Sequence, residues 1–69
     1  YRFFFYSNEG TEPPHVHVQV GRNLAKFWLD PVSLAAVRHF KAHEVSQLER
    51  LVVEHQKQLL EAWNAFFNA

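Results

Sequence analysis

Residues 12–20 constrain the fold of this chain more than any other stretch, because two prolines lead directly into a strict alternation of polar and apolar residues. The prolines fix their own φ angles and hold the residues before them in extended geometry. In the six residues that follow, valines take every second position and polar side chains take the others. A period of two is typical of a β-strand with one buried face. The stretch therefore predicts a strand that carries His15 and His17 side by side on its polar face.

The segments on either side of this strand predict an antiparallel meander. Residues 1–6 are an aromatic run of strong β preference. Residues 7–12 form a loop, in which Asn8 and Gly10 tolerate positive φ. Gly21-Arg22-Asn23 is a short hairpin connection, and it leads into a further strand over residues 24–29.

The region after residue 29 is less clear, because Asp30-Pro31 interrupts the strand pattern. Residues 32–37 fit either a kinked continuation of the strand or one helical turn capped by Asp30, and we favour the strand. From about residue 42 to 67 there is no Gly or Pro, and apolar residues recur at helical spacing. The helix is predicted to start after Lys41, which is a poor N-cap residue, with Glu44 at the third helical position.

One helix over residues 42–67 would be nearly 40 Å long, at about 1.5 Å per residue. This is longer than a small sheet is wide, so we expect its last turns to overhang the sheet. The overhang would carry Trp63, Phe66 and Phe67. Apolar area this dense is usually buried, and we therefore expect these three side chains to form a partner interface.

Together these elements predict one α+β domain over residues 1–69: an antiparallel meander of three to four strands, with one long C-terminal helix packed on a face. The chain has no Cys, so neither a disulfide nor a thiolate metal site can support so small a core. A domain of this size must then be unusually apolar for its length or share a core with a partner.

Charge and hydropathy narrow the possible partners and locations. The formal charge is zero, but residues 1–41 carry 5 − 3 = +2 and residues 42–69 carry 2 − 4 = −2. This polarity suits association with itself or with a polar protein, whereas nucleic acid usually requires a basic stripe. No apolar run approaches the roughly 20 residues that span a bilayer. We therefore expect no membrane partner, and the small size of the chain without cysteines favours a cytoplasmic protein.

His15 and His17 are the first candidates for chemistry. At i and i+2 on one face of a strand, the two Cβ atoms lie about 7 Å apart, and the two rings can converge on one ion or phosphate. They could bind a divalent metal, with Glu12 as the nearest third ligand and Glu9 behind it, or act as general acid and base. The simpler interpretation is a solvated or hydrogen-bonded polar face, so we expect no resident cofactor. Arg2 and Lys26 are anion-binding candidates, although we favour ordinary charge on the sheet surface as their explanation.

Residues 15–20 (HVHVQV) resemble the active-site strand of histidine-triad nucleotide hydrolases and transferases, where the middle histidine attacks a phosphate. The resemblance covers only six residues. That family needs a longer sheet and an upstream nucleotide-binding helix, for which this chain has no room. We therefore rank covalent chemistry at His17 below the other interpretations.

A resemblance over the whole chain is carried by four segments: YRFFFYSNEG at 1–10, EPPHVHV at 12–18, AKFWLDPV at 25–32 and LLEAW at 59–63. They resemble a family of small bacterial proteins, the domain-of-unknown-function family numbered four-one-six-zero. The resemblance implies a further short strand before residue 1. It also implies a component of a toxin–antitoxin-like gene pair, with a protein partner. It carries no catalytic residues.

These observations leave two hypotheses for the function. The first is a small bacterial interaction or regulatory protein, which acts as a dimer or with a cognate small protein. The alternative is a small nuclease or phosphodiesterase that uses His15 and His17, with Glu12 as a further catalytic candidate.

Overall fold

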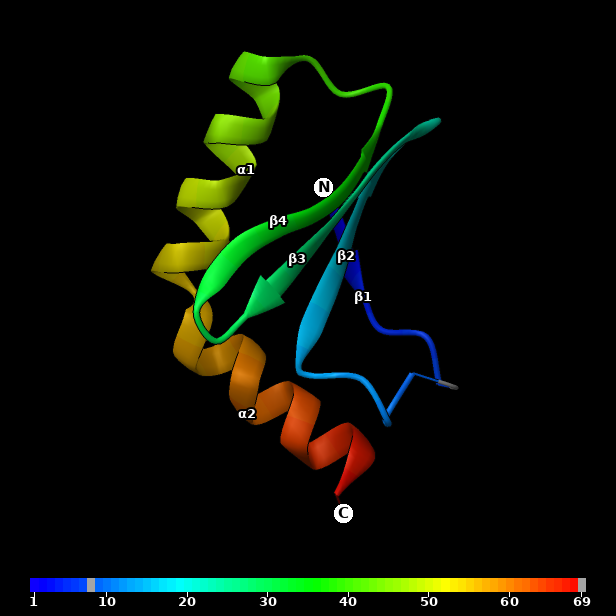
Figure 1. Cartoon of the computed structure of the whole chain (residues 1–69), viewed down its shortest axis with the longest axis vertical. Coiled ribbons are helices and arrows are strands. Elements are labelled where there is room, and N and C mark those ends of the chain that lie inside the picture. Colours follow the sequence, from blue (N-terminus) through cyan, green and yellow to red (C-terminus); the bar gives the residue numbers. More distant parts are fainter. Residues whose placement is uncertain (8, 69) are drawn as a thin grey trace.

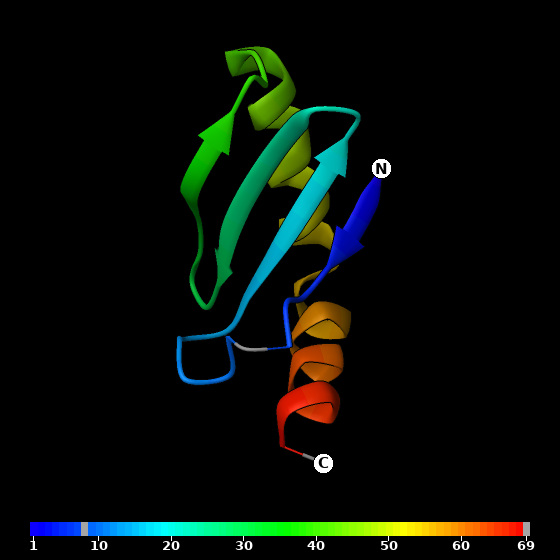
Figure 2. The same ribbon diagram turned by 90° about the vertical axis from the view of Figure 1, so that its right-hand side faces the viewer.

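Four antiparallel strands form one sheet in chain order, and two helices cover one of its faces (Figures 1 and 2). The computed structural model describes residues 1–7 and 9–68; the turn role predicted for Asn8 lies outside them. The elements are β1 (Arg2–Phe4), β2 (His15–Val20), β3 (Asn23–Leu29), β4 (Val32–Arg38), α1 (Ala42–Glu54) and α2 (Gln56–Phe67). The predicted α+β class and meander are confirmed.

The core lies between the sheet and the helices. Val16 and Val18 of β2 are fully buried, as the alternation in the sequence predicts. They share their face with the buried residues of β3 and meet two buried side chains of α1. The buried apolar residues on both sides are Val16, Val18, Ala25, Phe27, Leu29, Leu48 and Val52. Each fully buried large side chain stabilises the fold by roughly 1.5–3 kcal/mol.

β4 confirms that residues 32–37 continue the sheet as a strand. Among the described residues it pairs with β3 alone, and its register contains an irregularity. Lys26 faces Ala36 whereas Phe27 faces Leu34, so Ala35 is an extra residue in β4. Such a bulge bends a strand and increases its twist. The strand ends at Arg38, and the next residue, His39, has a φ of 71° in the left-handed region.

α1 begins where the sequence predicts. Lys41 precedes the first turn, and its backbone N–H donates to the Glu44 carboxylate at 2.8 Å. Nothing else in Lys41 caps the helix, since its ammonium can only donate.

The helical region is divided in two at His55, which differs from the single long helix that the sequence predicts. At this residue the backbone leaves helical geometry, with φ −108° and ψ 16°. The imidazole Nδ1 of His55 also donates to the Leu51 carbonyl at 2.9 Å, where it competes with the backbone N–H for the same oxygen. The chain bends here, and α2 takes a different direction from α1 (Figure 1).

A side-chain hydrogen bond holds α2 under the end of the sheet. The amide of Gln56, the first residue of α2, donates to the Leu29 carbonyl at 2.6 Å. Figures 1 and 2 show that the rest of α2 extends beyond the ends of the strands, beside the loop between β1 and β2. In the described part of the chain, neither helix has the length and apolarity that crossing a membrane requires.

Candidate functional site

The loop between β1 and β2 folds back over the polar face of β2 and covers both of its imidazoles. Phe4 lies opposite His17 in the sheet and stacks on its ring, with the centroids 5.3 Å apart. Tyr6 meets the same ring edge-on at 4.7 Å. His17 is therefore only 6% exposed.

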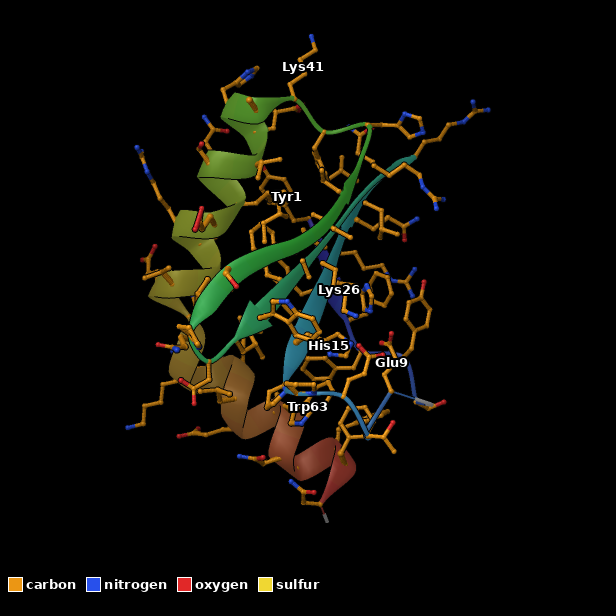
Figure 3. The ribbon with its side chains drawn as sticks, viewed as in Figure 1. Tyr1, Glu9, His15, Lys26, Lys41 and Trp63 are labelled. Atoms are coloured by element: carbon orange, nitrogen blue, oxygen red, sulfur yellow. The ribbon has the colours of Figure 1, made fainter. Side chains whose placement is uncertain are left out.

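His15 is fully buried, and aromatic rings from two other elements enclose it. Trp63 of α2 lies 4.8 Å from its ring centroid, and Trp28 of β3 lies 5.6 Å away. Figure 3 shows Trp63 and Glu9 close to His15, approaching from the helix and from the loop. The division of the helical region at His55 makes this contact possible, because a straight helix would carry Trp63 past the sheet.

Glu9, His15 and His17 form a buried polar group that we name the Glu9 cluster. One carboxylate oxygen of Glu9, Oε1, lies 2.8 Å from Nε2 of His15 and 2.8 Å from Nε2 of His17. Burial raises the pKa of Glu9, but the hydrogen bonds from His15 and His17 and their positive charge lower it by more. The pKa of Glu9 therefore lies below its ordinary value, and near neutral pH this side chain is an ionised acceptor.

The surroundings of His15 fix which of its atoms can donate. Nδ1 lies 2.9 Å from the carbonyl oxygen of Pro13, and that oxygen can only accept. Nδ1 therefore carries a proton, and Nε2 faces the carboxylate of Glu9. Two acceptors cannot face each other at 2.8 Å without a cation between them, so either a second proton or a metal ion belongs at Nε2. His17 differs from His15, because its buried Nδ1 has no hydrogen-bond partner among the described residues.

Glu12 does not join the Glu9 cluster, although the sequence nominates it as the nearest third ligand. Its carboxylate binds the ammonium of Lys26 at 2.7 Å. That ammonium also lies 4.6 Å above the ring of Trp28. Lys26 is one of the two anion-binding candidates. Its ammonium is thus already paired with the carboxylate of Glu12 and the ring of Trp28. The pair is partly exposed, so its net contribution to stability is small.

The other anion-binding candidate, Arg2, lies further along the sheet. Its guanidinium donates to the side chain of Gln19 at 3.3 Å and lies 4.7 Å above the ring of Phe4. Arg2 and Lys26 therefore do not converge on one point. A small hollow of about 150 Å³ borders His17 and Lys26 on the open face of the sheet, with Arg38 on its far wall.

The three aromatic residues nominated as a partner interface have different environments. Trp63 is buried and meets Phe5 edge-on, with the centroids 5.5 Å apart. Phe67 packs against Trp63 and lies so close to Gly10 that a Cβ there would be 2.6 Å from its ring. Only Phe66 has half of its surface exposed.

The sequence predicts Glu12, ahead of Glu9, as the third ligand because Glu12 is nearer to the two histidines along the chain. The turn between Glu9 and Glu12 determines which carboxylate reaches the histidines. In this turn the N–H of Glu12 donates to the carbonyl of Glu9 at 3.1 Å. This turn brings Glu9 back over β2. The signal in the sequence is Gly10, which admits the ring of Phe67 and so holds the loop close to α2.

Comparison with known proteins yields one match. Residues 1–64 match the model of a family described as "Domain of unknown function (DUF4160)". No curated protein and no solved structure matches the chain.

Proposed function

We propose, from the premise that this chain belongs to the DUF4160 family, that it is a small interaction domain. It acts as a dimer or with a cognate small protein, as a component of a bacterial toxin–antitoxin-like pair. The observation that supports this proposal is the exposed apolar edge of the sheet at β4.

β4 combines an open edge with apolar side chains. In the order β1-β2-β3-β4 it is an outer strand, and only β3 pairs with it among the described residues. All of residues 33–38 are exposed, and Leu34 and Val37 retain 40% and 46% of their surface. Figure 2 shows β4 at the margin of the sheet. An exposed apolar edge strand is a template for a strand from another chain.

A second copy of this chain is a suitable occupant of this edge. Arg38 is the single charged residue of β4, and it stands at one end of the strand. When two β4 strands meet antiparallel, their Arg38 side chains lie at opposite ends of the contact, so like charges do not face each other. The bulge at Ala35 limits the length of the shared ladder, and packing of Leu34 and Val37 then contributes most of the affinity.

Because both imidazoles are buried, we rank the nuclease or phosphodiesterase hypothesis behind the interaction domain. A general acid or base must come within about 3 Å of the substrate proton it transfers. His15 is fully enclosed, and Nε2 of His17 is held by Glu9 under two aromatic rings. A nuclease using these rings would first have to open the loop over them. RNA cleavage that disappears in the His17→Ala variant would favour this alternative.

The dimer is tested by replacing Val37 with Lys. We expect the wild-type protein to elute as a dimer at tens of micromolar in size-exclusion chromatography with light scattering, and Val37→Lys to elute as a monomer. A desolvated ammonium cannot be accommodated in an apolar contact between strands.

The matched control is Val53→Lys, on the exposed outer side of α1, where the side chain retains 56% of its surface. It adds the same charge at another exposed valine and should leave the dimer unchanged. A wild-type monomer at all concentrations, or equal effects of the two substitutions, would contradict association through β4. The cognate-partner form is tested by calorimetry with the protein encoded beside this one, and Val37→Lys should abolish that binding too.

A further inference from the structure

The three donor atoms of the Glu9 cluster converge as the ligands of a metal ion do. One ligand atom from each of Glu9, His15 and His17 lies within 4.8 Å of the other two, and Oε1 of Glu9 is 2.8 Å from Nε2 of both histidines. Two imidazoles and one carboxylate are the donor set of catalytic zinc sites and of non-haem iron sites. From this arrangement we infer that the Glu9 cluster binds a divalent first-row transition metal ion, for which zinc is the probe of choice.

The hydrogen bond from His15 to Pro13 supports this inference independently of the three distances. A metal-binding imidazole usually donates its other ring N–H to a carbonyl or carboxylate, which fixes the tautomer and the orientation of the ring. His15 does this through Nδ1 and the Pro13 carbonyl at 2.9 Å. The diproline thus presents Nε2 of His15 with its lone pair towards Glu9.

The adjustment needed to accommodate zinc is small. Zinc binds nitrogen and carboxylate oxygen at about 2.0–2.2 Å, so tetrahedral ligands lie about 3.3 Å apart. Each of the two contacts with Glu9 is 2.8 Å long and would lengthen by about half an ångström. The two Nε2 atoms would need to close to a similar distance. Glu9 is on a loop with a partly exposed side chain, so it can move more easily than the two strand residues.

The surroundings of the Glu9 cluster also suit a bound ion. Three protein ligands leave a fourth position for water, and a hollow of about 150 Å³ borders His17. The aromatic rings over His17 and His15 exclude bulk water and lower the local dielectric, which strengthens the bond between an ion and a carboxylate. A bound ion would fasten the loop at residue 9 to β2.

Calorimetric titration of the chelator-stripped protein with zinc tests the inference. We expect one ion per chain in the wild-type protein. Removal of a hydrogen-bonding partner of a metal ligand typically lowers affinity 10–100-fold, so loss of a ligand in His17→Ala should lower zinc affinity more than about 100-fold. Glu9→Gln should also weaken binding, since an amide oxygen is a poorer ligand than a carboxylate.

His43→Ala is the matched control, because it removes an exposed imidazole of α1 that lies outside the Glu9 cluster. It should leave the affinity and the stoichiometry unchanged. Circular dichroism identifies any variant that has lost its fold. Zinc binding equal in wild type and folded His17→Ala, or the absence of binding to the wild type, would overturn the inference and leave a cluster held by protons alone.

A second readout needs no substitution. In nitrogen-15 spectra of the wild-type imidazoles, zinc should move the Nε2 resonances of His15 and His17. The resonances of His39, His43 and His55 should stay in place at one equivalent of zinc. Shifts confined to these three exposed histidines would overturn the inference, because they would assign the binding to surface imidazoles.

Discussion

Glu9 shows at the residue scale how a loop side chain can become part of a core. It reaches β2 from the turn that ends at Glu12, and one of its oxygens serves two imidazoles. Distance along the sequence does not distinguish it from Glu12, because the choice depends on the path of the loop around Gly10. His15 and His17 differ in this respect: the alternation of residues 15–20 alone places them on one face, where the structure has them.

The metal-free protein should lose stability in acid through Glu9. The pKa of Glu9 is lowered on folding from an ordinary value of 4.5. A lowered pKa contributes stability above the unfolded-state value, and this contribution is lost as the pH falls through the lower, folded-state value. Glu9→Gln should therefore be less stable than wild type at pH 6 by roughly 1.5 kcal/mol or more, the size of a hydrogen bond to a charged group.

Urea unfolding with chelator, at a series of pH values, measures this difference. The gap between wild type and Glu9→Gln should narrow below about pH 4.5, where the carboxylate is protonated. Glu54→Gln, which changes an exposed acid of α1, is the control and should show little gap at any pH. If the difference in unfolding free energy between wild type and Glu9→Gln does not change with pH, the charge of the Glu9 carboxylate does not stabilise the fold.

At the scale of elements, the sequence determines the sheet better than the helices. Alternation, turn residues and the diproline predict β2, β3 and their hairpin, since each signal is local. The division at His55 has no such signal, because neither Gly nor Pro occurs there and histidine has an ordinary helix propensity. It depends on contacts across the molecule, between Gln56 and Leu29 and between Trp63 and His15. The burial of Trp63 follows from the same contacts.

The hydrogen bond from Gln56 should contribute measurably to the position of α2. Gln56→Ala leaves the Leu29 carbonyl without this donor, and loss of a partly buried hydrogen bond costs roughly 0.5–1.5 kcal/mol. The expected result is lower stability in thermal unfolding. Gln58→Ala changes an exposed amide of the same helix and serves as the control. Equal stability of the two variants would mean that packing alone positions α2.

At the scale of the whole molecule, the loop after β1 and the last turn of α2 meet in a close contact. Gly10 lies in the loop after β1, and Phe67 is the last residue of α2. An added Cβ at residue 10 would be 2.6 Å from the Phe67 ring, which is closer than real atoms approach, so the ring must move. The loop and the last turn of α2 therefore constrain each other.

A double-mutant cycle measures this constraint. Gly10→Ala should destabilise the protein by about 1–3 kcal/mol, as an overpacked contact does. In the Phe67→Ala background the same substitution should cost much less, because the ring has gone. Independent, additive effects of the two substitutions in urea unfolding would show that this contact does not constrain the loop.

Both tryptophans of the protein pack against the ring of His15, Trp63 from α2 and Trp28 from β3. The intrinsic fluorescence of the chain consequently comes from two indoles that share one neighbour. A change in the charge of that imidazole, whether from a proton or from an ion, alters the field at both chromophores at once. The emission spectrum of the unlabelled protein is thus a built-in optical probe of its most deeply buried polar group.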